Sequence, residues 1–197
     1  MKSFIAVEGL DGCGKTTLTK MLANELKGLY LSTPPAVLKA NGLRKKVDAE
    51  GSVQTRLFYY LLGNLLVSDE IKRMREFFPV VCDRYIHSTL SSFSTMVQAI
   101  GLDTNALGLE KPDITFFLLM SDEEERIERI RVRGRRTLND VKQEDLDFRR
   151  QYLDYYQRNS AEFTFVDTSH ETPAESLRKM KDELSRRGLL VPMILNT

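Results

Sequence analysis

The chain has 197 residues, with 29 lysines and arginines against 28 aspartates and glutamates, and a formal net charge of +1. Such balance argues against binding nucleic acid or a membrane through bulk electrostatics. The length is that of one domain, residues 1–197, whose core needs no disulfide or structural metal. The sequence has no signal-peptide pattern and no 18-residue apolar segment, and Cys13 and Cys82 lack the spacing of a metal site, so we expect a cytoplasmic protein.

The first predicted strand, residues 4–7, leads directly into a phosphate-binding loop. Residues 9–16 read Gly-Leu-Asp-Gly-Cys-Gly-Lys-Thr, and apolar residues at helical spacing follow over residues 17–27. A strand before the loop and a helix after it are the context that this motif requires. Lys15 supplies a cation to the phosphates and Thr16 a hydroxyl to Mg²⁺. We predict a bound nucleoside triphosphate, held by Gly9, Asp11, Gly12, Cys13, Gly14, Lys15, Thr16 and Thr17.

Four further apolar runs alternate with helical stretches along the chain. The runs cover residues 29–31, 80–82, 114–119 and 163–166, and the helical stretches cover residues 53–77, 88–100, 122–133, 143–159 and 174–187. Two helix starts carry capping boxes, Ser121 with Glu124 and Thr172 with Glu175. The alternation predicts one α/β domain, a P-loop kinase fold with a five-stranded parallel sheet flanked by helices on both faces.

Asp83 and Arg84 directly follow the strand predicted over residues 80–82. They therefore belong at the carboxyl edge of the sheet, where ligands of open α/β sheets bind. We predict that Asp83 and Thr16 hold Mg²⁺ and that Arg84 clamps an acceptor phosphate. A structural ion pair between Asp83 and Arg84 is the competing interpretation.

An arginine cluster, residues 131–136, lies at the end of the helix predicted over residues 122–133. Arg133 is explained by the helix dipole, because a base at the end of a helix stabilises it by about 0.3–1 kcal/mol. Arg135 and Arg136 lie beyond the helix in a polar segment, about 134–142, that suits a lid. A closing lid brings positive charge to a moving phosphoryl group and excludes water.

Four features occur in the order typical of the thymidylate kinase family, which the chain resembles over essentially its whole length. They are the phosphate loop, Asp83-Arg84-Tyr85 with Ser88, Lys111-Pro112-Asp113 before a strand, and the arginine-rich lid. The resemblance implies transfer of the γ-phosphoryl group of MgATP to a pyrimidine nucleoside monophosphate such as dTMP. It implies catalytic roles for Lys15, Arg84, Arg133, Arg135 and Arg136.

The resemblance also assigns roles within the loop. It implies that Asp11 meets the acceptor sugar and that Ser88 belongs to the acceptor site. In one subgroup of the family a catalytic arginine takes the position of Gly12. Glycine here is similar to the other subgroup, whose arginines come from the lid.

Two departures from thymidylate kinases concern the acceptor. Residues 32–35 read Ser-Thr-Pro-Pro where the family has an acceptor-phosphate arginine, for which Arg44 or Arg56 could substitute. Tyr60 and Asn64 take the places of a base-stacking Phe and an Arg near the base. These features resemble the mitochondrial-type UMP-CMP kinase branch, so a kinase that prefers (d)UMP or (d)CMP is the alternative. An asparagine amide both donates and accepts, which would admit cytosine.

Two further activities compete with this interpretation. A deoxynucleoside kinase needs a carboxylate base near the end of the second strand, where Ser32 offers none. A nucleotide-dependent switch that turns over slowly would not need both a lid and the Asp83-Arg84 pair. The expected partners are a nucleoside monophosphate and, in a homodimer, a second copy of the chain, with no nucleic acid or membrane.

Overall fold

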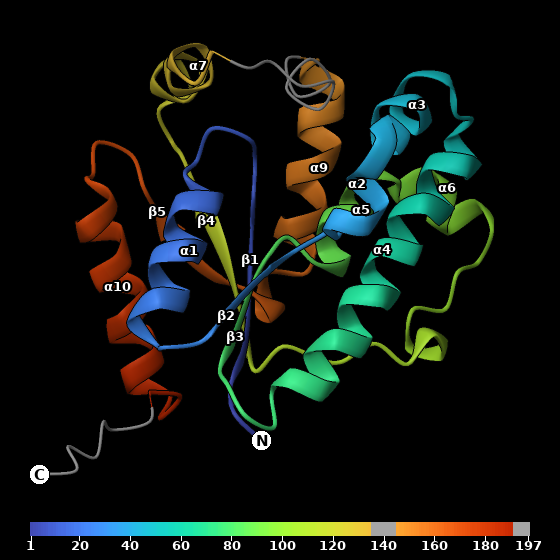
Figure 1. Cartoon of the computed structure of the whole chain (residues 1–197). Coiled ribbons are helices and arrows are strands. Elements are labelled where there is room, and N and C mark those ends of the chain that lie inside the picture. The colour runs from blue at the N-terminus through green and yellow to red at the C-terminus, as the bar shows by residue number, and fades with distance from the viewer. Residues whose placement is uncertain (135–144, 191–197) are drawn as a thin grey trace, which may run out of the picture.

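A computed structural model describes residues 1–134 and 145–190. Within them, five strands form one sheet in the order β2-β3-β1-β4-β5, and every pairing is parallel (Figure 1). The strands are β1 Phe4–Gly9, β2 Leu29–Ser32, β3 Val80–Asp83, β4 Ile114–Leu119 and β5 Thr164–Asp167. The α-helices are α1 Lys15–Glu25, α2 Ala36–Lys39, α3 Leu43–Glu50, α4 Val53–Met74, α5 Ile86–Ser92, α6 Ser94–Ala99, α7 Glu123–Val132, α9 Leu146–Arg158 and α10 Pro173–Arg186. Short 3₁₀ turns cover Ala40–Gly42, Asn105–Leu107 and Ser160–Glu162.

The two faces of the sheet bury separate clusters, because successive side chains of a strand point to opposite sides. Ile5 and Val7 of β1 pack into a core with α1 and α10, whereas Phe4 and Ala6 pack against α4 and α5. Figure 1 shows α1 and α10 on one side of the sheet and α4, α5 and α9 on the other. The predicted fold, a five-stranded parallel sheet with helices on both faces, is confirmed.

Several element boundaries differ from the predicted ones. The helix predicted over residues 88–100 is two helices, α5 and α6, because Phe93 leaves the helical conformation at φ −126° and ψ 25°. Helices α2 and α3 were not predicted. The cap of α7 is not Ser121 but Asp122, whose side chain accepts a hydrogen bond from the Glu125 N–H.

Other boundaries agree with the sequence. The capping box of Thr172 and Glu175 at the start of α10 is confirmed. In the sheet, Val7 pairs with Asp83, so the end of β3 lies beside the strand that leads into the phosphate loop. No helix among the described residues is long and apolar enough to cross a membrane.

Candidate active site

The loop between β1 and α1 requires glycine at position 12. Gly12 has a φ of +92°, and a Cβ there would lie 2.8 Å from the carbonyl oxygen of Arg126 and 2.9 Å from its Cγ. Real Cβ atoms do not approach that closely, so an arginine at this position would displace α7. The glycine that the sequence shows in place of a loop arginine is thus enforced by packing against α7.

Lys15 begins α1 and lies 5% exposed at the floor of the loop. Its Nζ donates to the carbonyl of Leu10 and lies 3.7 Å from Oδ1 of Asp11. The ammonium group is therefore almost fully buried beside the Leu10 carbonyl and Asp11. The Lys15 ammonium therefore lies within the loop before any phosphate binds.

Thr16 and Asp83 meet across the sheet edge, as predicted for a Mg²⁺ site. The Thr16 hydroxyl donates to Oδ2 of Asp83 at 2.5 Å, and the Tyr30 hydroxyl lies 3.4 Å from the same oxygen. The other oxygen, Oδ1 of Asp83, is buried and has no hydrogen-bond partner within the described structure. A buried carboxylate oxygen and a hydroxyl are hard oxygen ligands, so this pair fits Mg²⁺.

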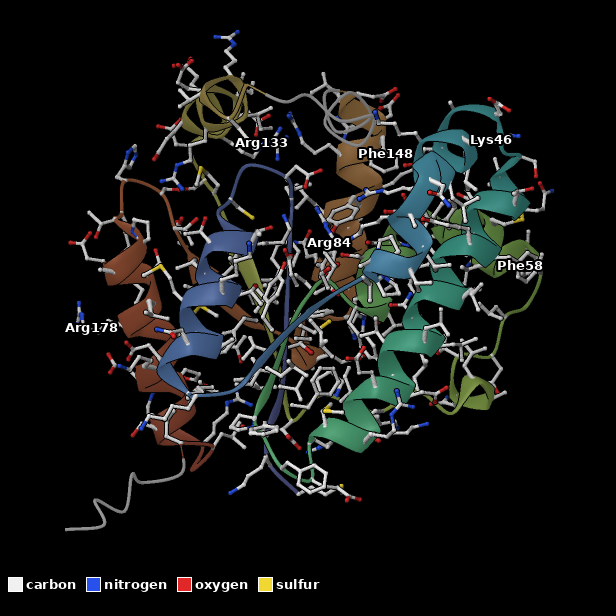
Figure 2. The ribbon with its side chains drawn as sticks, viewed as in Figure 1. Lys46, Phe58, Arg84, Arg133, Phe148 and Arg178 are labelled. Carbon is white, nitrogen blue, oxygen red and sulfur yellow. The ribbon has the colours of Figure 1, made fainter. Side chains whose placement is uncertain are left out.

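Arg84 lies at the centre of the site in a left-handed conformation, with φ +65° (Figure 2). Its backbone N–H donates to the carbonyl of Val7 at 2.9 Å. Its guanidinium pairs with Asp11 and donates to the Ser88 hydroxyl at 3.1 Å and the Gly9 carbonyl at 3.3 Å. Burial alone would raise the pKa of Asp11, but Arg84 and Lys15 beside it lower that pKa below its ordinary value. These contacts fix the guanidinium between the loop and α5.

Glu8 was missed by the sequence analysis. It is wholly buried in β1, and its carboxylate accepts hydrogen bonds from the Tyr85 N–H at 2.9 Å and from the N–H and hydroxyl of Ser88. Burial raises its pKa above the ordinary value. Glu8 therefore positions the first turn after Arg84. The feature of the sequence that could have identified Glu8 is its position as a single carboxylate in an otherwise apolar strand.

A cavity of about 500 Å³ opens beside the loop. Seven of the residues predicted to bind the nucleotide line it, namely Asp11, Gly12, Cys13, Gly14, Lys15, Thr16 and Thr17; Gly9 does not. Arg84 and, from the end of α7, Arg133 also line this cavity, which we call the donor cavity because residues predicted to bind the triphosphate line it (Figure 2). Arg135, Arg136 and nearly all of the lid, residues 134–142, lie outside the described residues.

A second cavity lies between α3, α4 and α5, and we call it the acceptor cavity because Tyr60, Arg84 and Ser88, which we predicted to bind the acceptor, line it. Its aromatic wall includes Tyr60 and Phe93, whose ring centroids are 6.0 Å apart, and Phe148 of α9. Arg44 and Arg84 supply its cations, and Thr33, Pro34, Ser88, Thr89 and Ser92 complete the lining. Among the described residues, Arg84 is the one that lines both the donor and the acceptor cavity.

Helix α3 brings Arg44 into the acceptor cavity, where residues 32–35 supply no arginine. Arg44 lines the acceptor cavity, and its Nε lies 3.5 Å from Asp48, which also accepts from the Tyr60 hydroxyl at 2.8 Å. Arg56, the other candidate, does not line this cavity; its Nη1 contacts the backbone carbonyl of Asp48. The structure thus brings Arg44, and not Arg56, to the acceptor cavity.

The structure does not bring Asn64 to the acceptor cavity. The Asn64 side chain is wholly buried behind Thr89, and its amide nitrogen donates to the Tyr60 carbonyl at 2.9 Å and to the Thr89 hydroxyl oxygen at 2.8 Å. The direct contact with a base that we predicted for Asn64 is therefore not available in this structure, because Thr89 covers it.

The chain is similar to known proteins over most of its length. The family model described as thymidylate kinase matches residues 7–179. A probable thymidylate kinase of Methanocaldococcus jannaschii is 27% identical over 192 residues, which cover 92% of this chain and 93% of the relative. The mitochondrial UMP-CMP kinase 2 of Homo sapiens is 35% identical over 140 residues, 66% of this chain but only 30% of that protein. The solved thymidylate kinase of Candida albicans superposes with a TM-score of 0.72 at 18% identity, covering 96% of this chain and 94% of that one, which establishes the likeness in fold.

Proposed function

Because the chain belongs to the thymidylate kinase family, we propose that it transfers the γ-phosphoryl group of MgATP to dTMP. The chain is an ATP-dependent nucleoside monophosphate kinase, and the finer proposal concerns its acceptor and its individual residues. The observation that carries it is the position of Arg84, which lines both cavities. A guanidinium shared by two anion sites neutralises charge on a group that moves between them.

On the donor side, the loop and Lys15 bind the β- and γ-phosphates, and Arg133 approaches from α7. Thr16 and the unpartnered oxygen of Asp83 would hold Mg²⁺, which supplies charge neutralisation to the phosphates when bound. Arg135 and Arg136 complete the positive charge from the lid, which we propose spans residues 134–142 of a single domain.

On the acceptor side, the base lies between the aromatic side chains of the cavity and the phosphate lies between Arg44 and Arg84. Ser88 orients Arg84 through its hydroxyl, and Asp11 reaches the sugar from the loop. The acceptor phosphate is already an anion and attacks without a general base. Among the described residues, no aspartate or glutamate lines the acceptor cavity, which disfavours a deoxynucleoside kinase.

The assay that tests this function couples ADP release to NADH oxidation, with dTMP, dUMP, dCMP, UMP, CMP and thymidine as acceptors. We expect dTMP to be the preferred acceptor and thymidine to be inactive. Chromatographic detection of dTDP separates transfer from ATP hydrolysis. Preference for a nucleoside would favour the deoxynucleoside kinase, and turnover slower than about one per minute with every acceptor would favour a switch, since kinases turn over at roughly 1–100 s⁻¹.

A stripe of exposed apolar side chains along α4 supports a homodimer. Phe58, Leu62 and Leu66 are spaced by one helical turn each and are 57%, 46% and 39% exposed. We propose that a second copy of the chain covers this stripe and that the protein acts in the cytoplasm. Light scattering of Phe58→Glu with Leu62→Glu tests the dimer, because two buried charges should shift the mass to that of one chain.

A further inference from the structure

The side chain of Glu123, in the first turn of α7, binds two arginines that belong to different helices. Arg126, one turn further along α7, donates from Nε to Oε2 at 2.7 Å and from Nη2 to Oε1 at 2.8 Å. Arg149 of α9 donates to the same Oε1 from its Nη1. Two parallel N–H···O bonds fix the orientation of a guanidinium on a carboxylate, so the Arg126 pair has a set geometry. Arg149 then joins α9 to this pair.

The guanidinium of Arg126 also reaches the phosphate loop. It is buried, and its Nη1 donates to the backbone carbonyl of Asp11 at 2.6 Å. Arg126 packs on the next loop residue as well, because a Cβ at Gly12 would lie 2.8 Å from the Arg126 carbonyl oxygen. A continuous series of hydrogen bonds therefore runs from the loop through Arg126 and Glu123 to α9.

The two ends of this series of bonds belong to different cavities. The loop lines the donor cavity, whereas Phe148, which directly precedes Arg149 on α9, lines the acceptor cavity. Figure 2 shows Phe148 on α9 and, at the end of α7, Arg133 of the donor cavity. Glu123 itself lines neither cavity. Its contacts therefore bear on where the two cavities lie relative to each other, and leave the lining of each unchanged.

The rate of phosphoryl transfer depends steeply on the distance between the two nucleotides. The attacking oxygen and the transferred phosphorus must lie about 3–3.5 Å apart and in line with the leaving oxygen. A misplacement of about 1 Å, even one caused far from the reacting atoms, can cost about a hundredfold in rate. Contacts that hold the acceptor wall against the loop, and that touch neither nucleotide, therefore act on the chemical step more than on binding.

We propose that Glu123 is a positioning residue which, through Arg126 and Arg149, holds the wall of the acceptor cavity at a set distance from the phosphate loop. The inference rests on the proposed function, because it assigns a residue to the alignment of donor and acceptor. Removing Arg149 leaves the lining of both cavities complete but lets α9 move relative to the loop. Such a variant should bind each nucleotide as wild type does and transfer the phosphoryl group slowly.

The test is Arg149→Met, which keeps the length of the side chain and removes its charge. Arg149 is 21% exposed, and Arg126 still pairs with Glu123 in the variant, so no buried charge is left alone. We expect kcat for dTMP to fall about tenfold or more, while the Kd values of ADP and of dTMP, each measured alone by calorimetry, change less than about twofold. Adenosine and thymidine joined 5′ to 5′ by five phosphates span both cavities, and this ligand should bind about tenfold more weakly. Arg149→Lys keeps the charge and should recover most of the lost kcat.

Arg150→Met is the matched control. Arg150 is the next residue of α9, is 74% exposed and lies 3.6 Å from Asp147 of its own helix, so this variant should match wild type in kcat and in all three Kd values. Wild-type kcat in Arg149→Met, or equal weakening of the spanning ligand and the single nucleotides, would overturn the proposal.

Failure of the proposed function would look different. Wild-type protein that neither binds nor phosphorylates dTMP would contradict that function, and hydrogen exchange of the ligand-free protein would still decide on Glu123. Arg149→Met, unlike Arg150→Met, should speed the exchange of the loop amides, because the link between α9 and the loop is lost. Equal exchange in the two variants would overturn the positioning role.

Discussion

Replacing Gly12 by alanine tests whether packing of α7 against the loop excludes a side chain there. Gly12 and Gly101 both have positive φ values, +92° and +61°, but an added Cβ meets Arg126 within 2.9 Å at Gly12 and nothing within 4 Å at Gly101. Both substitutions carry a backbone cost of about 1–2 kcal/mol. Gly12→Ala adds overpacking of about 1–3 kcal/mol. We therefore expect its free energy of unfolding to lie about 1–3 kcal/mol below that of Gly101→Ala.

Relaxation of Arg126 cannot absorb the clash cheaply. The Arg126 side chain is 1% exposed, and it donates to the carbonyl of Asp11 at 2.6 Å and to Glu123 at 2.7 Å. Moving it would break these bonds as well. Urea unfolding followed by circular dichroism measures the difference between the two variants. Equal stability of Gly12→Ala and Gly101→Ala would refute the reasoning and would leave room for an arginine in the loop.

Three further outcomes are expected. Lys15→Ala should abolish phosphoryl transfer while the circular dichroism spectrum stays that of wild type, because the ammonium serves the phosphates; near-normal turnover would remove the catalytic role of the loop. Arg135→Ala and Arg136→Ala, singly or together, should lower kcat at least about tenfold, and wild-type kcat in all three would leave these arginines as surface charges. Burial lowers the pKa of His87 from 6.5 to about 4. The contribution of the neutral imidazole to the free energy of unfolding is therefore fully present above pH 6.5 and is lost as the pH falls toward 4. Between pH 7.5 and pH 5, wild type should lose about 2 kcal/mol more free energy of unfolding than His87→Gln; equal losses would contradict a buried neutral imidazole.

Local sequence patterns predicted the fold because each depends only on residues that are close together in the sequence. The loop with its flanking strand and helix is one contiguous segment, and the approach of Asp83 to Thr16 follows from the rule that ligands bind at the carboxyl edge of parallel strands. The capping box of Thr172 is likewise set by residues three positions apart. Features of this kind follow from the local sequence and from the general geometry of parallel sheets.

The acceptor site could not be predicted in this way, because tertiary contacts build it. Arg44 reaches the cavity on α3, an eight-residue helix with no buried side chain, whose sequence carries little of the apolar pattern that marks a helix packed on the core. Asn64 is one turn from Tyr60 and was expected to share its ligand, but the approach of α5 covers it with Thr89. In the sequence, Glu8 is a lone carboxylate within an apolar strand. Its role follows only from the hydrogen bonds that Tyr85 and Ser88 donate to it in the folded chain.

The conformation of Arg84 connects these observations. A left-handed arginine costs about 1–2 kcal/mol, and such strain persists only where surrounding contacts hold it. Val7 binds its N–H, Asp11 binds its guanidinium, and Glu8 holds the next turn through Ser88. These contacts hold Arg84 where it lines both cavities, and in the proposed reaction a guanidinium held in this way places its positive charge before charge develops on the transferred group. Asp11 pairs with both Lys15 and Arg84 and so offsets the repulsion between their like charges.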